Sequence, residues 1–124
     1  MTDSKSTINW FEIPVKDFDR AVAFYGRILG RDLVRSEGGP IKMAFLGEDP
    51  ANPGGALSCG PGMEPGDKGT VVYLNGGRDL AEIMDRVEPS GGQVLIPKTR
   101  ISDDYGYFGM FLDSEGNRVG LHNY

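Results

Sequence analysis

Apolar residues alternate at the start of the chain and then recur with helical spacing. The alternation from Ile8 to Val15 predicts a strand, with Trp10 and Glu12 on the same side. Asp17 stands where a helix N-cap belongs, and the apolar residues after it have the spacing of an amphipathic helix. Gly30 is placed to end that helix in a left-handed conformation. Three more strands are expected, at residues 32–36, 41–46 and 56–59.

The second half of the chain repeats this order. A β-branched and aromatic run at residues 70–75 predicts a strand, and Asp79 is placed as a second N-cap before apolar residues at helical spacing. Further strands are expected at residues 93–96, 107–112 and 118–122, and a hairpin turn at 114–117. The two capping aspartates are offset by roughly 60 residues, as in a duplication. The pattern is therefore β-α-β-β-β, twice.

A segment rich in glycine and proline, residues 60–69, separates the two halves. It is interpreted as a loop that joins a first module, about residues 7–60, to a second, about residues 69–124. A module of this length buries too little apolar surface to be stable alone. We therefore expect one domain over residues 1–124, in which the two modules pack as a cooperative unit.

Composition excludes several classes of protein. A single cysteine, Cys59, rules out an internal disulfide framework, and a single histidine, His122, rules out sites that need two imidazoles from one chain. The net charge of -5 argues against nucleic acid as a partner. No apolar run is long enough to span a membrane, and the polar start at residues 1–5 lacks the apolar core of a signal peptide. These features predict a cytoplasmic protein without a membrane partner.

Two motifs resemble a known family. The first is Glu-Ile-Pro-Val-Lys-Asp at residues 12–17, followed by Arg20-Ala21, Phe24-Tyr25 and Leu29-Gly30, and the second is the turn and strand at residues 113–121. Together they resemble the vicinal oxygen chelate superfamily, which includes glyoxalase I, extradiol dioxygenases and bleomycin-resistance proteins. The resemblance implies an α+β fold of two paired βαβββ modules that form a curved mixed sheet around a cleft. It also implies a homodimer.

Enzymes of that superfamily place metal ligands, commonly His, Gln or Glu, on the first and last strands of the modules. The resemblance puts those positions at Trp10, Ala56 and Gly120, with either Val71 or Val72 as the counterpart of Trp10. None of these side chains has a lone pair to offer a metal. We therefore expect a degenerate metal site and no cofactor, and Ala56 and Gly120 should leave room in the cleft. The sequence leaves open whether a divalent ion binds at a relocated site that includes Glu12 and His122.

Trp10 and Glu12 should face the cleft together because residues two apart in a strand share a face. Glu12 is a candidate general base or anchor for a cationic ligand. The competing interpretation is a carboxylate hydrogen-bonded to Tyr73 or to a backbone amide. His122 shares the face of Gly120 and is a candidate partner of Glu12 in acid–base chemistry, or else a partly exposed residue at a strand end.

Aromatic and sulfur-containing side chains are candidates for the pocket wall: Tyr73, Tyr107, Met43 and Phe45, with Tyr105 as a further one. Core packing explains the same residues equally well. Cys59 has no cation near it in sequence, which indicates an inert thiol. The Gly76-Gly77 pair lacks the spacing of a dinucleotide-binding loop and is interpreted as a turn.

The sequence favours a small-molecule-binding protein similar to glyoxalases and bleomycin-resistance proteins, with its metal site degenerate and catalysis open. One alternative is a metal-dependent lyase or isomerase of the glyoxalase type that uses Glu12 and His122. Another is a resistance protein that sequesters a drug across a dimer. In each case the expected partners are a small organic ligand and a second copy of the chain.

Overall fold

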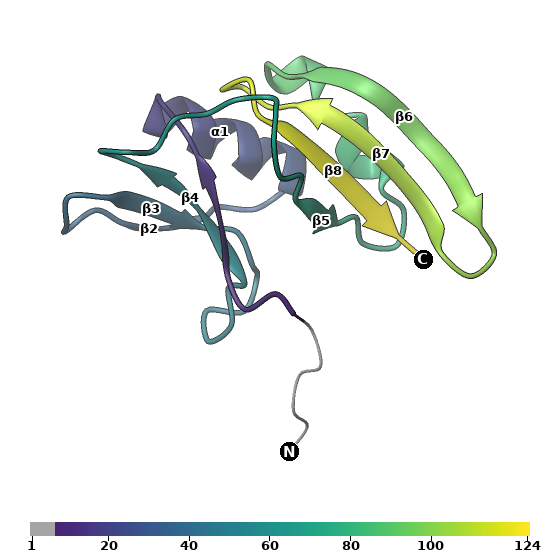
Figure 1. Cartoon of the computed structure of the whole chain (residues 1–124), viewed down its shortest axis with the longest axis horizontal. Coiled ribbons are helices and arrows are strands. Elements are labelled where there is room, and N and C mark those ends of the chain that lie inside the picture. Colours follow the sequence, from purple (N-terminus) through teal and green to yellow (C-terminus); the bar gives the residue numbers. More distant parts are fainter. Residues whose placement is uncertain (1–6) are drawn as a thin grey trace.

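The computed structural model describes residues 7–124, which form two four-stranded sheets (Figure 1). The polar start at residues 1–5 lies outside this range. The first sheet has the order β1 (Phe11–Pro14), β4 (Gly55–Cys59), β3 (Lys42–Phe45) and β2 (Val34–Ser36). The second sheet has the order β5 (Tyr73–Asn75), β8 (Arg118–Asn123), β7 (Gly106–Leu112) and β6 (Gln93–Ser102). The mixed β-structure predicted from the sequence is thus divided between two separate sheets.

The two sheets repeat each other strand by strand, which confirms the predicted βαβββ pattern. In each sheet the first strand of the half runs parallel to the last one, and the remaining pairs are antiparallel. Glu12 pairs with Ala56 in the first sheet, and Tyr73 pairs with Gly120 in the second. The register therefore makes Glu12 equivalent to Tyr73 and Ala56 equivalent to Gly120.

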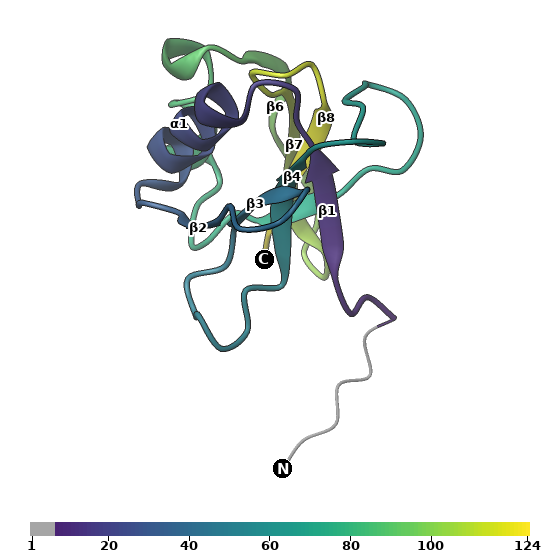
Figure 2. The same cartoon turned by 90° about the vertical axis from the view of Figure 1, so that its left-hand side faces the viewer.

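Helix α1 (Phe18–Leu29) begins and ends where the sequence predicts. The Asp17 carboxylate accepts a hydrogen bond from the backbone N–H of Arg20 at 3.1 Å, which satisfies one of the free amides of the first turn. Gly30 ends the helix with φ 73°, a left-handed conformation that glycine adopts without a Cβ clash. In Figure 2 the helix lies on one side of the strands and β1 lies on the other.

The second half departs from the prediction in two elements. Helix α2 covers only Ala81–Met84, because the N–H groups of Arg86 and Val87 bond three residues back rather than four, and a 3₁₀ turn at Glu88–Ser90 follows. The N-cap of α2 is Leu80 rather than the predicted Asp79, although the Asp79 carboxylate accepts a hydrogen bond from the Ala81 N–H at 3.0 Å. Strand β6 runs on to Ser102, well beyond the predicted end at residue 96. It is an edge strand, where proline is tolerated, so Pro97 does not end it.

The hydrophobic core is shared between the two halves. Phe24 and Tyr25 of α1 pack against Phe111 of β7, with ring centroids 6.0 and 6.4 Å apart. One continuous buried cluster runs from Ile13 on β1 to Leu121 on β8. Each module therefore completes its core with side chains of the other. Within the described residues, no helix has the length and apolar character needed to cross a bilayer.

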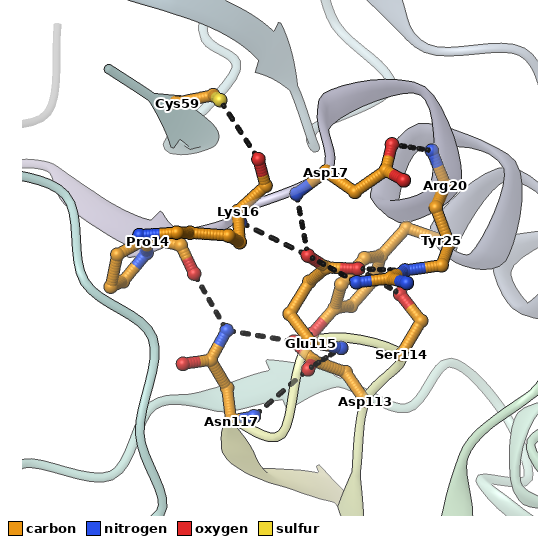
Figure 3. Close-up of polar contacts among 10 residues, drawn as sticks. All are labelled: Pro14, Lys16, Asp17, Arg20, Tyr25, Cys59, Asp113, Ser114, Glu115 and Asn117. Carbon is orange, nitrogen blue, oxygen red and sulfur yellow. Dashed lines mark hydrogen bonds and ion pairs between the residues drawn. The ribbon is translucent and has the colours of Figure 1, made fainter.

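A buried carboxylate fastens the β7–β8 turn to the start of α1 (Figure 3). Oε1 of Glu115 accepts hydrogen bonds from the N–H groups of Lys16 and Asp17 at 3.0 and 2.8 Å. Its Oε2 pairs with Nε of Arg20 at 2.7 Å, and the Glu115 side chain is 0% exposed. We call these four residues the Glu115 clasp. It joins the closing motif of the sequence to the opening motif.

A second set of buried polar groups lies beside the clasp (Figure 3). The Tyr25 hydroxyl donates to Oδ2 of Asp113 at 2.7 Å, and Nδ2 of Asn117 donates to the same oxygen at 3.0 Å. Asn117 also donates to the carbonyl of Pro14 at 2.7 Å. Burial, together with the negative charge of Asp113, raises the pKa of Tyr25 well above its ordinary value, so its phenol stays protonated.

Candidate functional site

The open face of the first sheet carries four of the predicted site residues. Glu12, Ala56 and Phe45 lie in one row across β1, β4 and β3, and Met43 lies two residues from Phe45 on the same face. The Trp10 ring packs edge-on against Phe45, with centroids 6.2 Å apart. Trp10 is 38% exposed. The predicted neighbours Trp10, Glu12, Met43 and Phe45 therefore form one group, which we call the Trp10 face.

Glu12 is held in place by two side-chain donors. Its Oε1 accepts a hydrogen bond from the Ser58 hydroxyl at 2.8 Å, and its Oε2 accepts one from the Trp10 indole N–H at 3.3 Å. These partners differ from the Tyr73 hydroxyl or backbone amide considered from the sequence. The carboxylate keeps its exposure while its orientation is set by Ser58 and Trp10. Such an oxygen is available as an acceptor toward a ligand on this face.

The open face of the second sheet holds a pocket of about 940 Å³. Tyr73, Asn75, Phe108 and His122 contribute to it from three adjacent strands, in register across β5, β8 and β7. The complete lining is mainly apolar and aromatic: Tyr73, Leu74, Asn75, Gly77, Arg78, Ile101, Phe108, His122, Asn123 and Tyr124. We call this the β8 pocket.

The space expected at Gly120 is already filled. A Cβ atom at this position would lie 2.4 Å from the ring of Tyr73, so the ring rests directly on the glycine backbone. Ala56, the equivalent residue in the first sheet, is completely buried. The predicted room at these two positions is thus wrong, because the Tyr73 ring covers Gly120 and Ala56 is completely buried.

His122 and Glu12 lie on different sheets. Nε2 of His122 donates to the carbonyl of Tyr105 at 2.6 Å, and the imidazole packs edge-on against the Tyr124 ring at 4.7 Å. Among residues 7–124, no hydrogen bond or ion pair joins His122 to Glu12. Within one chain, the acid–base pair considered from the sequence is therefore not assembled.

Tyr107 lies on the opposite face from His122. It pairs with Asn123 rather than His122, packs against the core, and has Nζ of Lys98 4.5 Å from its ring centre. Phe108 holds the pocket position that we expected of Tyr107. Sequence reasoning also missed Arg78, which lines the pocket directly after the Gly76-Gly77 turn. The β7–β8 register decides whether Phe108 or Tyr107 lies on the same face of the sheet as His122.

The residues at the superfamily's ligand positions do not fit a metal. The equivalence of Glu12 and Tyr73 makes Val71, two residues before Tyr73, the counterpart of Trp10. Indole, methyl, isopropyl and hydrogen groups at Trp10, Ala56, Val71 and Gly120 offer no donor atom. Within the part of the chain that the structure describes, no three His, Cys, Asp or Glu side chains gather as a metal site would require. Cys59 directs its thiol to the carbonyl of Lys16 at 3.6 Å.

A second pocket, of about 1080 Å³, lies where the two halves meet, between the C-terminal end of α1 and the residues that follow β5. Its lining mixes carboxylates with guanidinium groups, including Glu48, Asp49 and Arg86. Arg86 donates to the carbonyl of Ile28 at 3.0 Å and so ties the second half to the end of α1. This hollow mixes charged groups with apolar side chains such as Phe11 and Ile83, and it shares Tyr73 and Arg78 with the β8 pocket.

Comparison with known proteins agrees with this architecture. The chain is 29% identical over 128 residues to the "Putative glyoxylase CFP32" of Mycobacterium bovis and to that of Mycobacterium tuberculosis. These matches cover 94% of this chain and 45% of the relatives, so the chain spans less than half of their length.

Solved structures show the same fold at low sequence identity. A glyoxalase/bleomycin resistance protein from Albidiferax ferrireducens superimposes with a TM-score of 0.69 at 15% identity, over 94% of this chain and 98% of that one. Glyoxalase I from Zea mays gives 0.67 at 21% identity, over 94% and 44%. The fosfomycin resistance protein FosX from Mesorhizobium loti gives 0.63 at 16%, over 100% and 94%.

One protein-family model matches nearly all of the chain. Residues 7–121 match the family model, and this range includes both sheets except for the last two residues of β8. It also includes the clasp and the whole Trp10 face. The chain therefore belongs to the Glyoxalase/Bleomycin resistance protein/Dioxygenase superfamily.

Proposed function

We propose that this protein binds a small organic molecule on the open faces of its sheets and that its superfamily metal site is degenerate. The observation that carries the proposal is the β8 pocket, about 940 Å³ in volume and lined by Tyr73, Phe108 and Tyr124 with few polar groups. Pockets for small ligands have this size and composition. The aromatic rings would supply the binding area, and Asn75 and His122 would orient the ligand.

The Trp10 face is proposed as the second wall of the site. The exposed indole offers apolar area, and Glu12, fixed by Ser58, offers an oriented acceptor for a hydroxyl or cationic group. Because this face and the β8 pocket belong to different sheets, we propose that they meet in a homodimer. A site shared by two copies would use the Trp10 face of one and the pocket of the other.

Chemistry by a Glu12–His122 pair receives less support from this geometry. Each group is engaged elsewhere within its own chain, Glu12 by Ser58 and Trp10 and His122 by Tyr105. General acid–base catalysis requires both groups within hydrogen-bonding reach of one substrate, and only the proposed dimer, with the Trp10 face of one copy against the β8 pocket of the other, would bring them there. Binding without turnover, as in a sequestering protein, is the form of the proposal that the contacts favour.

A ligand screen tests the proposal. Thermal-shift measurements with small aromatic, keto-acid and thiol-adduct compounds should identify molecules that raise the Tm. Phe108→Ala and Trp10→Ala should each weaken those ligands by about 2 kcal/mol, because each removes an aromatic anchor from the site. Glu12→Gln should weaken only polar or cationic ligands. Isothermal titration measures each affinity.

Leu95→Ala is the matched control, since Leu95 is an exposed apolar residue on the edge strand β6 that belongs neither to the Trp10 face nor to the lining of the β8 pocket. It should bind every ligand as the unsubstituted chain does. An unchanged affinity in Trp10→Ala removes the Trp10 face from the site. If Phe108→Ala also leaves all affinities unchanged, the proposed pocket is wrong.

The protein as purified should contain no stoichiometric transition metal. Trp10, Ala56, Val71 and Gly120 provide no donor at the positions where the superfamily's metal ligands would stand. Elemental analysis after gel filtration in metal-free buffer is the measurement. About one zinc, nickel, iron or manganese ion per chain, retained through dialysis, would contradict this expectation.

A further inference from the structure

We infer that Arg78 makes the β8 pocket selective for ligands that combine an aromatic or apolar body with one anionic group, such as a carboxylate, sulfonate or phosphate. This inference rests on the proposed function, because it names the class of molecule that the same pocket would hold. It concerns a residue that the sequence pattern passed over as part of a turn.

The charge of the pocket lining differs from the charge of the chain. The whole chain carries a net charge of -5. No Asp or Glu side chain is among the residues that line the β8 pocket, and Arg78 is the one permanently charged residue that does. His122 is the other titratable nitrogen base there. An anion entering this pocket therefore meets a cation and no Asp or Glu side chain of the lining. Arg78 also lines the second pocket, beside Glu48, Asp49, Asp79 and Glu82, but among residues 7–124 none of these carboxylates forms an ion pair with it.

Arg78 has no partner of its own among residues 7–124. No hydrogen bond or ion pair of its guanidinium occurs in this part of the chain, whereas most other arginines are paired. The adjacent carboxylate, Asp79, is already engaged by Nζ of Lys98 at 2.8 Å and by the Ala81 N–H at 3.0 Å. Five N–H donors are thus left to a ligand, in the planar arrangement that matches two oxygens of an anion.

The turn that carries Arg78 is fixed from the pocket side. Oδ1 of Asn75 accepts a hydrogen bond from the Gly77 N–H at 2.9 Å, and Gly77 has φ 74°. This contact leaves the Asn75 amide N–H₂ as a second donor on the pocket wall. Tyr73 and Phe108 lie on the same wall and present rings to the body of a ligand. Tyr73 and Phe108 thus provide the apolar surface of the pocket, and Arg78 provides its positive charge.

Two fluorescent probes with the same body distinguish anion recognition from simple apolar binding. Anilinonaphthalene sulfonate carries a sulfonate, and phenylnaphthylamine is the same aromatic body without it. We expect the anionic probe to bind more tightly than the neutral one. Arg78→Gln should weaken the anionic probe by about tenfold and leave the neutral probe unchanged. Arg78→Lys should recover part of the affinity, because it keeps the charge and loses the planar fork.

Arg118→Gln is the matched control. It removes the same charge from the same sheet, yet Arg118 does not line the pocket. Near-ultraviolet circular dichroism of each variant checks that the fold is kept. Equal loss of the anionic probe in Arg118→Gln and Arg78→Gln would show only a general field effect and would overturn the inference.

The probes also separate this inference from the proposed function. If both probes bind equally well before and after Arg78→Gln, and Phe108→Ala weakens both, the pocket is a binding site and anion selectivity is wrong. If neither probe binds the unsubstituted protein, the proposed function fails together with the inference. Tighter binding of the neutral probe would likewise refute the role of Arg78.

Discussion

Glu115 shows how one side chain connects the two ends of the sequence. Its burial acts to raise its pKa, but the hydrogen bonds from Arg20, Asp17, Lys16 and Ser114 together outweigh burial and hold the pKa below the ordinary value of 4.5. The folded chain therefore binds this proton less readily than the unfolded chain does. The resulting stabilisation is complete above pH 4.5 and is lost as the pH falls through the lower, folded-state pKa.

Glu115→Gln should lower the free energy of unfolding at pH 7 by about 1–2 kcal/mol, because an amide replaces a carboxylate that accepts from a guanidinium and two backbone amides. The difference from the unsubstituted chain should shrink as the pH falls through the lowered folded-state pKa of Glu115, where the carboxylate becomes protonated. Urea unfolding at a series of pH values measures both effects. Glu64→Gln is the control, since the Glu64–Lys16 pair is largely exposed. A pH-independent difference would contradict this account of the clasp.

At the scale of the elements, the contact between α1 and the β7–β8 turn depends on a buried phenol. Tyr25 is completely buried and donates to Asp113, which accepts from Asn117 as well. Removing the hydroxyl leaves a buried carboxylate oxygen with one fewer donor, and such a loss costs more than an exposed hydrogen bond does.

Tyr25→Phe should therefore destabilise the chain by about 1–3 kcal/mol, while Tyr105→Phe, at an exposed tyrosine in the β6–β7 turn, should have no effect. Thermal unfolding of the two variants gives the comparison. Spectrophotometric titration offers a second readout, because the raised pKa of Tyr25 predicts a phenol that ionises only when the protein unfolds. Ionisation of all tyrosines in the folded protein near pH 10 would be inconsistent with this burial.

The elements differ in how well the sequence predicts them. Helix α1 has a side-chain cap, an apolar face and a terminal glycine, and all three are local signals. The length of β6 depends on its place at the sheet edge, and α2 ends early where its hydrogen bonds tighten to three-residue spacing. Neither feature is visible from periodicity alone. Local signals therefore predicted the repeated order of elements, but not every boundary.

The candidate site was harder to predict because it depends on pairing between strands. Trp10 and Glu12 lie two residues apart in one strand, so their common face follows from the strand period. Tyr107 and His122 lie in different strands, and a shift of one residue in their register exchanges Tyr107 for Phe108. Arg78 follows a turn, where no periodic pattern indicates the direction of a side chain.

At the scale of the whole molecule, each sheet has one face in the shared core and one open face. Trp10, Val34 and Tyr73 are 38%, 60% and 49% exposed. Apolar residues exposed on open sheet faces are candidates for surfaces that another molecule covers. The core shared by α1 and β7 leaves the open faces as the surfaces available for association.

The chain should accordingly form a homodimer through these faces. Sedimentation velocity over a range of concentrations should show a species of twice the chain mass, and Trp10→Lys should shift it toward monomer, because it replaces the apolar indole with an ammonium group that is costly to desolvate. Ile8→Lys, at another exposed apolar residue before β1, tests whether any added charge has the same effect. A protein that stays monomeric at high concentration would refute the dimer.

The Tyr73 ring that rests on Gly120 also has an evolutionary consequence. A descendant of this chain that acquired a carboxylate at position 120 would place its Cβ 2.4 Å from that ring, so the new residue could not be accommodated until Tyr73 had changed. Losing the ring first would uncover the backbone of β8 and remove a pocket wall, with no metal gained in exchange. Two substitutions would have to arise together, and neither is favourable alone. Selection acting one substitution at a time would therefore tend to keep a carboxylate out of position 120 in this lineage.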